Sequence, residues 1–259
     1  MRSIISSVTR QGAYEPFELQ VSRGQIQGHR NVTVFGFNQD VDTTQVSVWP
    51  LPSLITFPAA ALQMTVSSAS ADDTSAGTGA RTIVVQGLDA NYNEVTETVT
   101  MNGQTAVTMT TFMLRLNYAY VVTAGSGNGA AGDIYIGTGT VTAGVPATVY
   151  DIIKFDYNTT ITGSYTVPAG YTAYVSQGLF SAGQAGGSNQ VQGRLLTRGT
   201  DNIRRTAAVT SINNGVADYT FEYPLAVPAK TTIEATAVGS SNNNAVSSMF
   251  ILVLIKEGP

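Results

Sequence analysis

The sequence predicts an all-β protein in which an N-terminal extended arm precedes two β-sandwich domains, the second of them jelly-roll-like. Three observations support this fold class. Runs rich in β-branched residues alternate with short turns, and no segment carries a sustained apolar period of 3.6 residues. Only 12% of the 259 residues are charged, well below the usual share, while 43% are hydrophobic. That hydrophobic share, together with a net charge of only −4, is typical of a folded chain rather than a disordered one.

The clearest strand pattern lies in residues 80–122. Two turn signals, at residues 89–93 and at Asn102-Gly103, separate three β-rich runs. Asparagine and glycine tolerate the left-handed backbone that hairpin turns require. Over residues 94–101 apolar and polar side chains alternate with a period of two, which is typical of a strand with one buried face. The stretch therefore predicts an antiparallel meander of three strands.

Residues 1–55 differ from the rest of the chain. Short strands are expected at 17–21 and 31–37, but glycines interrupt any longer element, and the segment closes in a proline-rich piece beside Trp49. We expect an arm or a small additional sheet that packs on a neighbouring molecule. The alternative is that the segment supplies edge strands to its own domain.

Two sandwich domains are expected to follow the arm. Residues 56–148 contain at least five predicted strands, enough for a small sandwich. Residues 149–259 contain eight more without helical periodicity, which suits a jelly roll or a related Greek-key sandwich. These eight strands are predicted at 152–155, 163–167, 171–176, 190–196, 206–211, 217–223, 231–238 and 248–256.

The last predicted strand is apolar on both faces. Met249, Ile251, Val253 and Ile255 alternate with Phe250, Leu252 and Leu254. Since one sandwich core covers only one face of a strand, a neighbouring sheet, domain or subunit is expected on the other. The predicted partner is a second copy of the chain, in a symmetric homo-oligomer for which a trimer is favoured over a dimer. The residues expected to form this contact are Met249, Phe250, Leu252 and Leu254.

The sequence predicts neither catalytic residues nor a cofactor or metal site. The single histidine, His29, lies in a glycine-bounded turn, and cysteine is absent. Acidic pairs of the kind that a glycosidase uses occur only in predicted loops, without a groove rich in tryptophan, and the two closely spaced pairs lack the pattern of a calcium loop. Tyrosines within predicted strands, such as Tyr118 and Tyr174, are assigned to packing rather than to a sugar-binding face. The acidic pairs considered are Asp40 with Asp42, Asp72 with Asp73, and Asp151 with Asp156.

Charge and hydropathy argue against two classes of partner. A pI near 4.9 disfavours nucleic acid, because phosphate binding requires concentrated lysine and arginine. The longest apolar run, residues 249–255, is too short to cross a bilayer, and the N-terminus lacks the apolar core of a signal peptide. Four arginines form a local exception, which we assign to a solvated face or an inter-subunit salt bridge. They are Arg194, Arg198, Arg204 and Arg205.

Residues 87–99 resemble a segment of virion structural proteins of tailed bacteriophages, including those of phages that infect cyanobacteria. The segment reads Gly-Leu-Asp-Ala-Asn-Tyr-Asn-Glu-Val-Thr-Glu-Thr-Val. The resemblance extends over residues 15–175. Further pieces that carry it are residues 17–24, 31–36, 64–70, 102–105, 112–116 and 124–127.

This resemblance implies a non-enzymatic component of a virus particle, assembled in the host cytoplasm. The function we expect first is that of a cement, or decoration, protein on the outer capsid surface, with the major capsid protein as its partner. The second is a tail or head fibre subunit that binds a host-surface polysaccharide. A third and weaker alternative is an enzyme acting on that polysaccharide.

Overall fold

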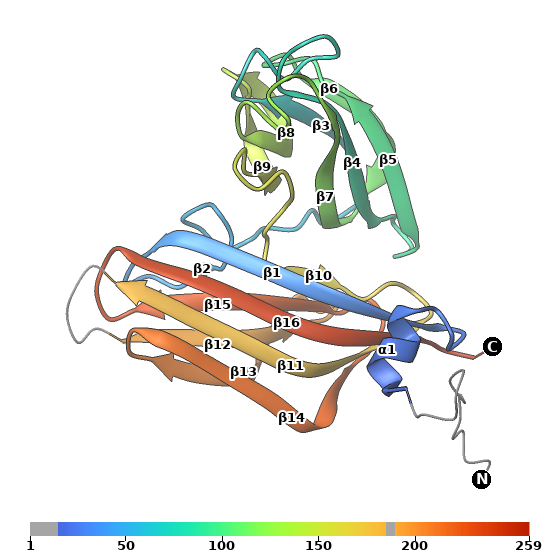
Figure 1. Ribbon diagram of the computed structural model, residues 1–259, viewed down its shortest axis with the longest axis vertical. Helices are drawn as coiled ribbons and strands as arrows, with labels where there is room; N and C mark the ends of the chain where they lie inside the picture. The colour runs from blue at the N-terminus through green and yellow to red at the C-terminus, as the bar shows by residue number, and fades with distance from the viewer. Residues whose placement is uncertain (1–14, 185–189, 259) are drawn as a thin grey trace.

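The computed structural model describes residues 15–184 and 190–258, which form two antiparallel β-sandwiches (Figure 1). The all-β prediction is confirmed. Within the described residues the single helix is α1 (Phe17–Ser22), and no helix is long and apolar enough to cross a membrane. In Figure 1 the smaller sandwich stands above β1 of the larger one.

Eight main strands and the added two-residue β2 build the larger sandwich. One sheet has the order β1-β16-β11-β14 and the other β10-β15-β12-β13, with the short β2 (Val46–Ser47) added beside β15. Counting the eight main strands in chain order, the sheets read 1-8-3-6 and 2-7-4-5, which is the strand order of a jelly roll. The strands are β1 (His29–Val41), β10 (Ser164–Thr166), β11 (Tyr171–Gln184), β12 (Val191–Arg198), β13 (Arg204–Ile212), β14 (Gly215–Val227), β15 (Thr232–Gly239) and β16 (Asn244–Lys256).

The N-terminal segment is not a separate arm over its described part. β1 pairs along its whole length with β16 and is the first strand of the jelly roll. Val34 and Val41 lie in the large core, and Gly36 packs so closely that an added Cβ would stand 2.4 Å from the carbonyl oxygen of Val48. The arm expected over residues 1–55 is corrected accordingly, because its strand partner lies at the opposite end of the chain. Residues 1–14 lie outside the described part.

The strand predicted at residues 17–21 is also wrong, because this segment forms α1. Pro16, with φ −54°, precedes the helix, and Glu18 places an acidic side chain in its first turn. The Ser22 hydroxyl donates a hydrogen bond to the Glu18 carbonyl at 2.8 Å. These helix-start signals are local, but the helix is too short to show a 3.6-residue period.

The smaller sandwich is inserted between the first two strands of the jelly roll. Its sheets have the orders β6-β3-β8-β9 and β5-β4-β7, and they enclose a separate core that includes Met64, Met109 and Met113. Its last strand runs to Ile153, beyond the boundary expected at residue 148. The strands are β3 (Leu62–Ser68), β4 (Ala80–Leu88), β5 (Glu94–Thr100), β6 (Val107–Met113), β7 (Arg115–Ala124), β8 (Ile134–Thr142) and β9 (Val145–Ile153).

The predicted three-stranded meander is right for its first hairpin and wrong for its third strand. β4 and β5 pair antiparallel as expected. The third run breaks at the buried Leu114, so that β6 joins the opposite sheet and β7 returns to β4. The Glu97 carboxylate accepts the backbone N–H groups of Thr110 and Thr111 at 2.8 and 2.7 Å. This side chain therefore joins β5 to β6 where no backbone ladder does.

Candidate assembly surface and interdomain cleft

The last strand divides its apolar residues between the protein's own core and an outer sheet face. Val246, Phe250, Leu252 and Leu254 are buried inside the large sandwich. The alternate row, which consists of Met249, Ile251, Val253 and Ile255, is half-buried on the outside of the same sheet.

Three of the four residues expected at a subunit contact are therefore core residues. Phe250, Leu252 and Leu254 are at most 1% exposed within a single chain, so they cannot also contact a second copy. Met249 alone of the four lies on the outer face. The sequence shows that both rows are apolar, but it contains no local signal for which row faces the core.

Neighbouring strands extend the outer row sideways. Met249 stands directly opposite Phe35 of β1 and Leu179 of β11, and Val253 stands opposite Tyr174. Phe35 is 55% exposed. The outer rows of β16 and β11 carry no charged side chain along their paired lengths. We call this surface the outer apolar face; it comprises Phe35, Tyr174, Leu179, Met249, Ile251, Val253 and Ile255.

A cleft of about 540 Å³ lies between the two sandwiches. Residues 30–35 of β1 line one side, and the neighbouring ends of β4, β5 and β7 line the other. The chain that leaves the small sandwich, residues 159–162, also lines the cleft.

Polar contacts join the two sandwiches around this cleft. Arg30 of β1 forms an ion pair with Glu94 of β5. The side chain of Asn117 both donates to the Thr166 carbonyl and accepts the Thr166 N–H, each at 2.9 Å. The amide of Ala169 adds a bond of 2.8 Å to the Tyr92 carbonyl. These contacts place the two walls of the cleft relative to each other.

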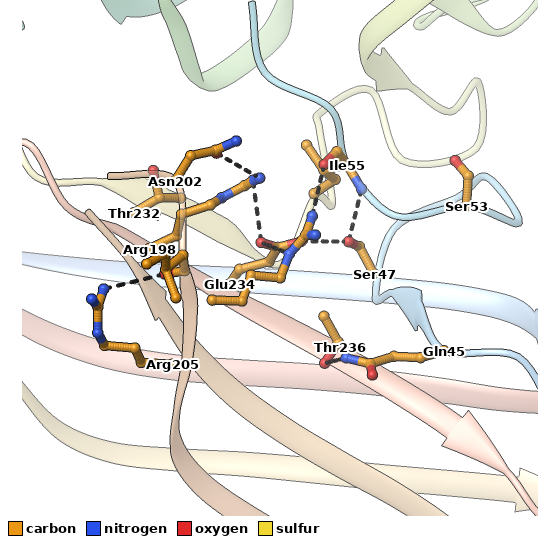
Figure 2. Close-up of polar contacts among 12 residues, drawn as sticks. Gln45, Ser47, Ser53, Ile55, Arg198, Asn202, Arg205, Thr232, Glu234 and Thr236 are labelled. Atoms are coloured by element: carbon orange, nitrogen blue, oxygen red, sulfur yellow. Dashed lines mark hydrogen bonds and ion pairs between the residues drawn. The ribbon is translucent and has the colours of Figure 1, made fainter. Parts of the chain in front are cut away.

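Two of the four predicted surface arginines meet one buried carboxylate. Glu234 of β15 is fully buried, and its carboxylate lies 3.3 Å from Arg198 (Figure 2). The same carboxylate also lies 3.3 Å from Arg204. The hydroxyl of Ser47 donates to the same carboxylate at 2.8 Å. Burial lowers the pKa of Arg198 to about 10, although the Glu234 charge acts in the opposite direction. Arg198 is therefore an internal ion-pair partner, which corrects its expected solvated or inter-subunit role, whereas Arg204 reaches the same carboxylate from the surface.

The Glu234 cluster also anchors the chain that leads to the small sandwich. The Ser47 hydroxyl accepts the amide of Ile55 at 2.9 Å, and Arg204 donates to the carbonyl of Ile55 at 3.2 Å. The guanidinium of Arg198 lies 4.1 Å from the centre of the Phe57 ring. The other two arginines behave as polar surface groups: Arg205 pairs with Asp201, and Arg194 donates to Gln45.

Two members of the acidic pairs considered in the sequence, Asp73 and Asp151, are buried inside the protein. Asp73 is buried and accepts hydrogen bonds from Ser68 and from three backbone amides, which fixes the loops at one end of the small sandwich. Asp151 is buried too, and burial raises its pKa to about 6. Among residues 15–184 and 190–258, no three His, Asp or Glu side chains gather closely enough to hold a metal ion.

His29 lies at the start of β1, not in a cavity. Its ring packs edge-on against Phe17 with 6.0 Å between centroids, and Nδ1 lies 3.0 Å from the carbonyl oxygen of Gln27. No carboxylate among the described residues pairs with it. This arrangement holds the α1 helix against the strand and does not resemble a catalytic triad.

Comparison with known proteins finds no family model and no curated protein that matches this chain. Among solved structures, the infectious bursal disease virus VP2 subviral particle aligns with 89% of this chain and 72% of that chain, at 11% identity and a TM-score of 0.24. The PBSX exported protein XepA aligns with 85% of this chain and 84% of that chain, at 10% identity and a TM-score of 0.19. TM-scores of this size do not establish a shared fold or function.

Proposed function

We propose that this protein is a non-enzymatic structural component of a bacteriophage particle, acting as a cement protein on the outer capsid surface. The observation that carries the proposal is the outer apolar face, because a sheet face of this kind requires cover in an assembled state. The jelly-roll strand order supports it by analogy, since this fold is used in viral capsid domains. The resemblance of residues 15–175 to phage virion proteins points the same way.

The occupant proposed for the outer apolar face is a second copy of this chain. The outer rows of β16 and β11 are uncharged, and the nearest charge on β14, Asp218, lies at the edge of the face opposite Leu179, so two copies can meet along β16 without direct like-charge contact. Symmetric homo-oligomers are the usual result of such self-complementary surfaces. We favour a trimer over a dimer, with the remaining surface of each copy bridging major capsid proteins.

The second candidate is a fibre or adhesin subunit that binds a host-surface polysaccharide. The interdomain cleft favours it, because a preformed cavity of about 540 Å³ falls within the size range of small-ligand sites, about 300–1,000 Å³. Jelly rolls also occur among lectin domains, which is again an analogy of fold.

A pair of aspartate substitutions tests the assembly surface. Ile251→Asp places a charge in the outer apolar face, and Val209→Asp is the matched control on β13, where the valine is already 53% exposed. We expect sedimentation to show that Ile251→Asp dissociates the oligomer, while Val209→Asp does not, because an unpaired charge in an apolar contact is costly. Unchanged association in Ile251→Asp would refute the assigned surface.

Particle assays separate the two candidate functions. Under the cement function, particles that lack the protein lose resistance to heat or osmotic shock but still adsorb to cells. Particles that remain robust and fail to adsorb would refute the cement function and support the fibre function.

A further inference from the structure

The interdomain cleft has a lining of mixed polar and aromatic character. On one wall, Thr96, Gln86 and Tyr118 stand side by side on adjacent strands, because Gln86 is directly opposite both of the others. All three are exposed, Tyr118 by 42% of its surface. This row presents a hydroxyl, an amide and an aromatic ring toward solvent in a fixed order.

The opposite wall is the strand β1. Asn31, Thr33 and Phe35 occupy alternate positions there, so they share one face of the strand. Figure 1 shows β1 running beneath the ends of β4, β5 and β7, which carry the first wall. The cleft is therefore bounded on both sides by strands, which are more rigid supports for a binding site than loops.

Charge excludes several classes of ligand. The cleft contains one arginine, Arg30, and this arginine is paired with the one carboxylate, Glu94. A phosphate or sulfate ligand would require unpaired cationic groups, and a metal ion would require more carboxylates. A purely apolar ligand would leave the amides and hydroxyls of the lining without partners.

Two lining residues carry polar atoms that lack partners. Nε of Arg30 and Oδ1 of Asn31 are buried, and neither makes a hydrogen bond within the described part of the chain. One is a donor and the other an acceptor. Both atoms are enclosed by the protein, and the Asn31 amide nitrogen already donates to the Glu18 carbonyl and to the Ser22 hydroxyl of α1, so neither atom serves as a contact for a ligand.

We propose that the cleft binds a short neutral oligosaccharide. A pyranose ring has an apolar C–H face, which packs on the exposed ring of Tyr118, and a rim of hydroxyls that both donate and accept hydrogen bonds. Gln86 and Thr33, both exposed, are placed to bond this rim from the two walls. Tyr120 lies 5.4 Å from Tyr118 between ring centroids and supports its ring. This inference names the ligand class of the second candidate function; the cleft shares Phe35 with the outer apolar face, but the row of Thr96, Gln86 and Tyr118 lies outside that face.

Titration of the full-length protein with defined sugars tests the site. The probes are neutral trisaccharides of glucose, galactose, mannose and N-acetylglucosamine, with a trisaccharide of glucuronic acid as the anionic comparison, followed by calorimetry. We expect at least one neutral probe to bind and the anionic probe to bind more weakly. Tyr118→Ala and Gln86→Ala should each weaken binding by about tenfold, whereas Tyr223→Ala, an 83% exposed tyrosine on β14, should leave it unchanged.

Three results would overturn the proposal. The first is that no neutral probe binds, and the second is that binding survives both cleft substitutions. The third is that an extended threonine–valine hexapeptide binds while no sugar does, which would indicate strand addition along β1. Tyr118→Ala should not alter self-association measured by sedimentation. Loss of sugar binding is thereby distinguished from failure of the assembly surface.

Discussion

Removing the charge of Glu234 is expected to destabilise the large sandwich strongly. In the folded protein the Glu234 carboxylate is fully buried, and Arg198, with only 7% of its side chain exposed, lies 3.3 Å away. Glu234→Gln keeps the shape and an acceptor for Ser47 but leaves the Arg198 guanidinium buried without a counter-charge. Breaking a buried pair in this way typically costs about 3–5 kcal/mol.

Urea unfolding followed by circular dichroism measures this effect. The free energy of unfolding of an ordinary domain is about 5–15 kcal/mol, so a loss of about 3–5 kcal/mol is a large part of it. The urea concentration at the unfolding midpoint should therefore fall clearly. The double variant Glu234→Leu/Arg198→Met should recover much of the loss, because replacing a buried pair by apolar residues of similar volume is often neutral. Arg204 can turn outward in that variant, since 31% of its side chain is exposed.

The matched control is Asp201→Asn, which removes the partner of Arg205 in an exposed i,i+4 pair. We expect Asp201→Asn to lower the free energy of unfolding by less than about 1 kcal/mol, as is usual for surface ion pairs. If Glu234→Gln shifts the free energy of unfolding no more than Asp201→Asn, the carboxylate is not the buried centre of an ion-pair cluster and the reasoning fails.

Three further predictions concern single residues. Leu252→Ala should lower the free energy of unfolding by about 2–5 kcal/mol in urea titration without changing the sedimentation of the remaining folded protein, since its side chain fills the core. Burial raises the pKa of Asp151 to about 6, so this carboxyl holds its proton more tightly in the folded than in the unfolded state. The free energy of unfolding should therefore fall by about 3 kcal/mol as the pH rises from about 4 to about 6. Urea titrations across that range should show that Asp151→Asn abolishes this fall. If the free energy of unfolding instead rises over this pH range in the parent protein but not in Asp151→Asn, the predicted direction of the pH dependence is wrong. His29→Ala should change the free energy of unfolding by less than about 1 kcal/mol and leave particle infectivity intact, and lost infectivity of a stable variant would restore a chemical role for this residue.

Local patterns predicted the strands well but not their partners. The alternation over residues 94–101 and the turn at 89–93 correctly predicted the hairpin of β4 and β5. The same kind of pattern made residues 31–37 a strand, yet nothing near them indicates β16 as the partner. Which strand pairs with β1 depends on which distant segment completes the core, and the residues near β1 carry no local signal for that segment.

The candidate surfaces show the same limit. Two equally apolar rows in residues 249–255 indicated that both faces need cover, but the core side is decided by the sheet that packs beneath them. Glu234 meets Ser47, Arg198 and Arg204 only because four strands converge. No sequence pattern indicated the cleft, because Tyr118 alternates with its neighbours along a predicted strand in the same way as a tyrosine that packs in a core.

The pairing of β1 with β16 has a consequence for how the protein is made. These strands are neighbours in the sheet although about 200 residues separate them along the chain, so the jelly roll cannot close until β16 has been synthesised. The inserted sandwich, whose strands are all contiguous in the chain, is free to fold on the ribosome while β1 waits with an open edge. Until β16 emerges, the segment that becomes β1 lacks its strand partner, and an unpaired strand edge is a site where chains can associate wrongly.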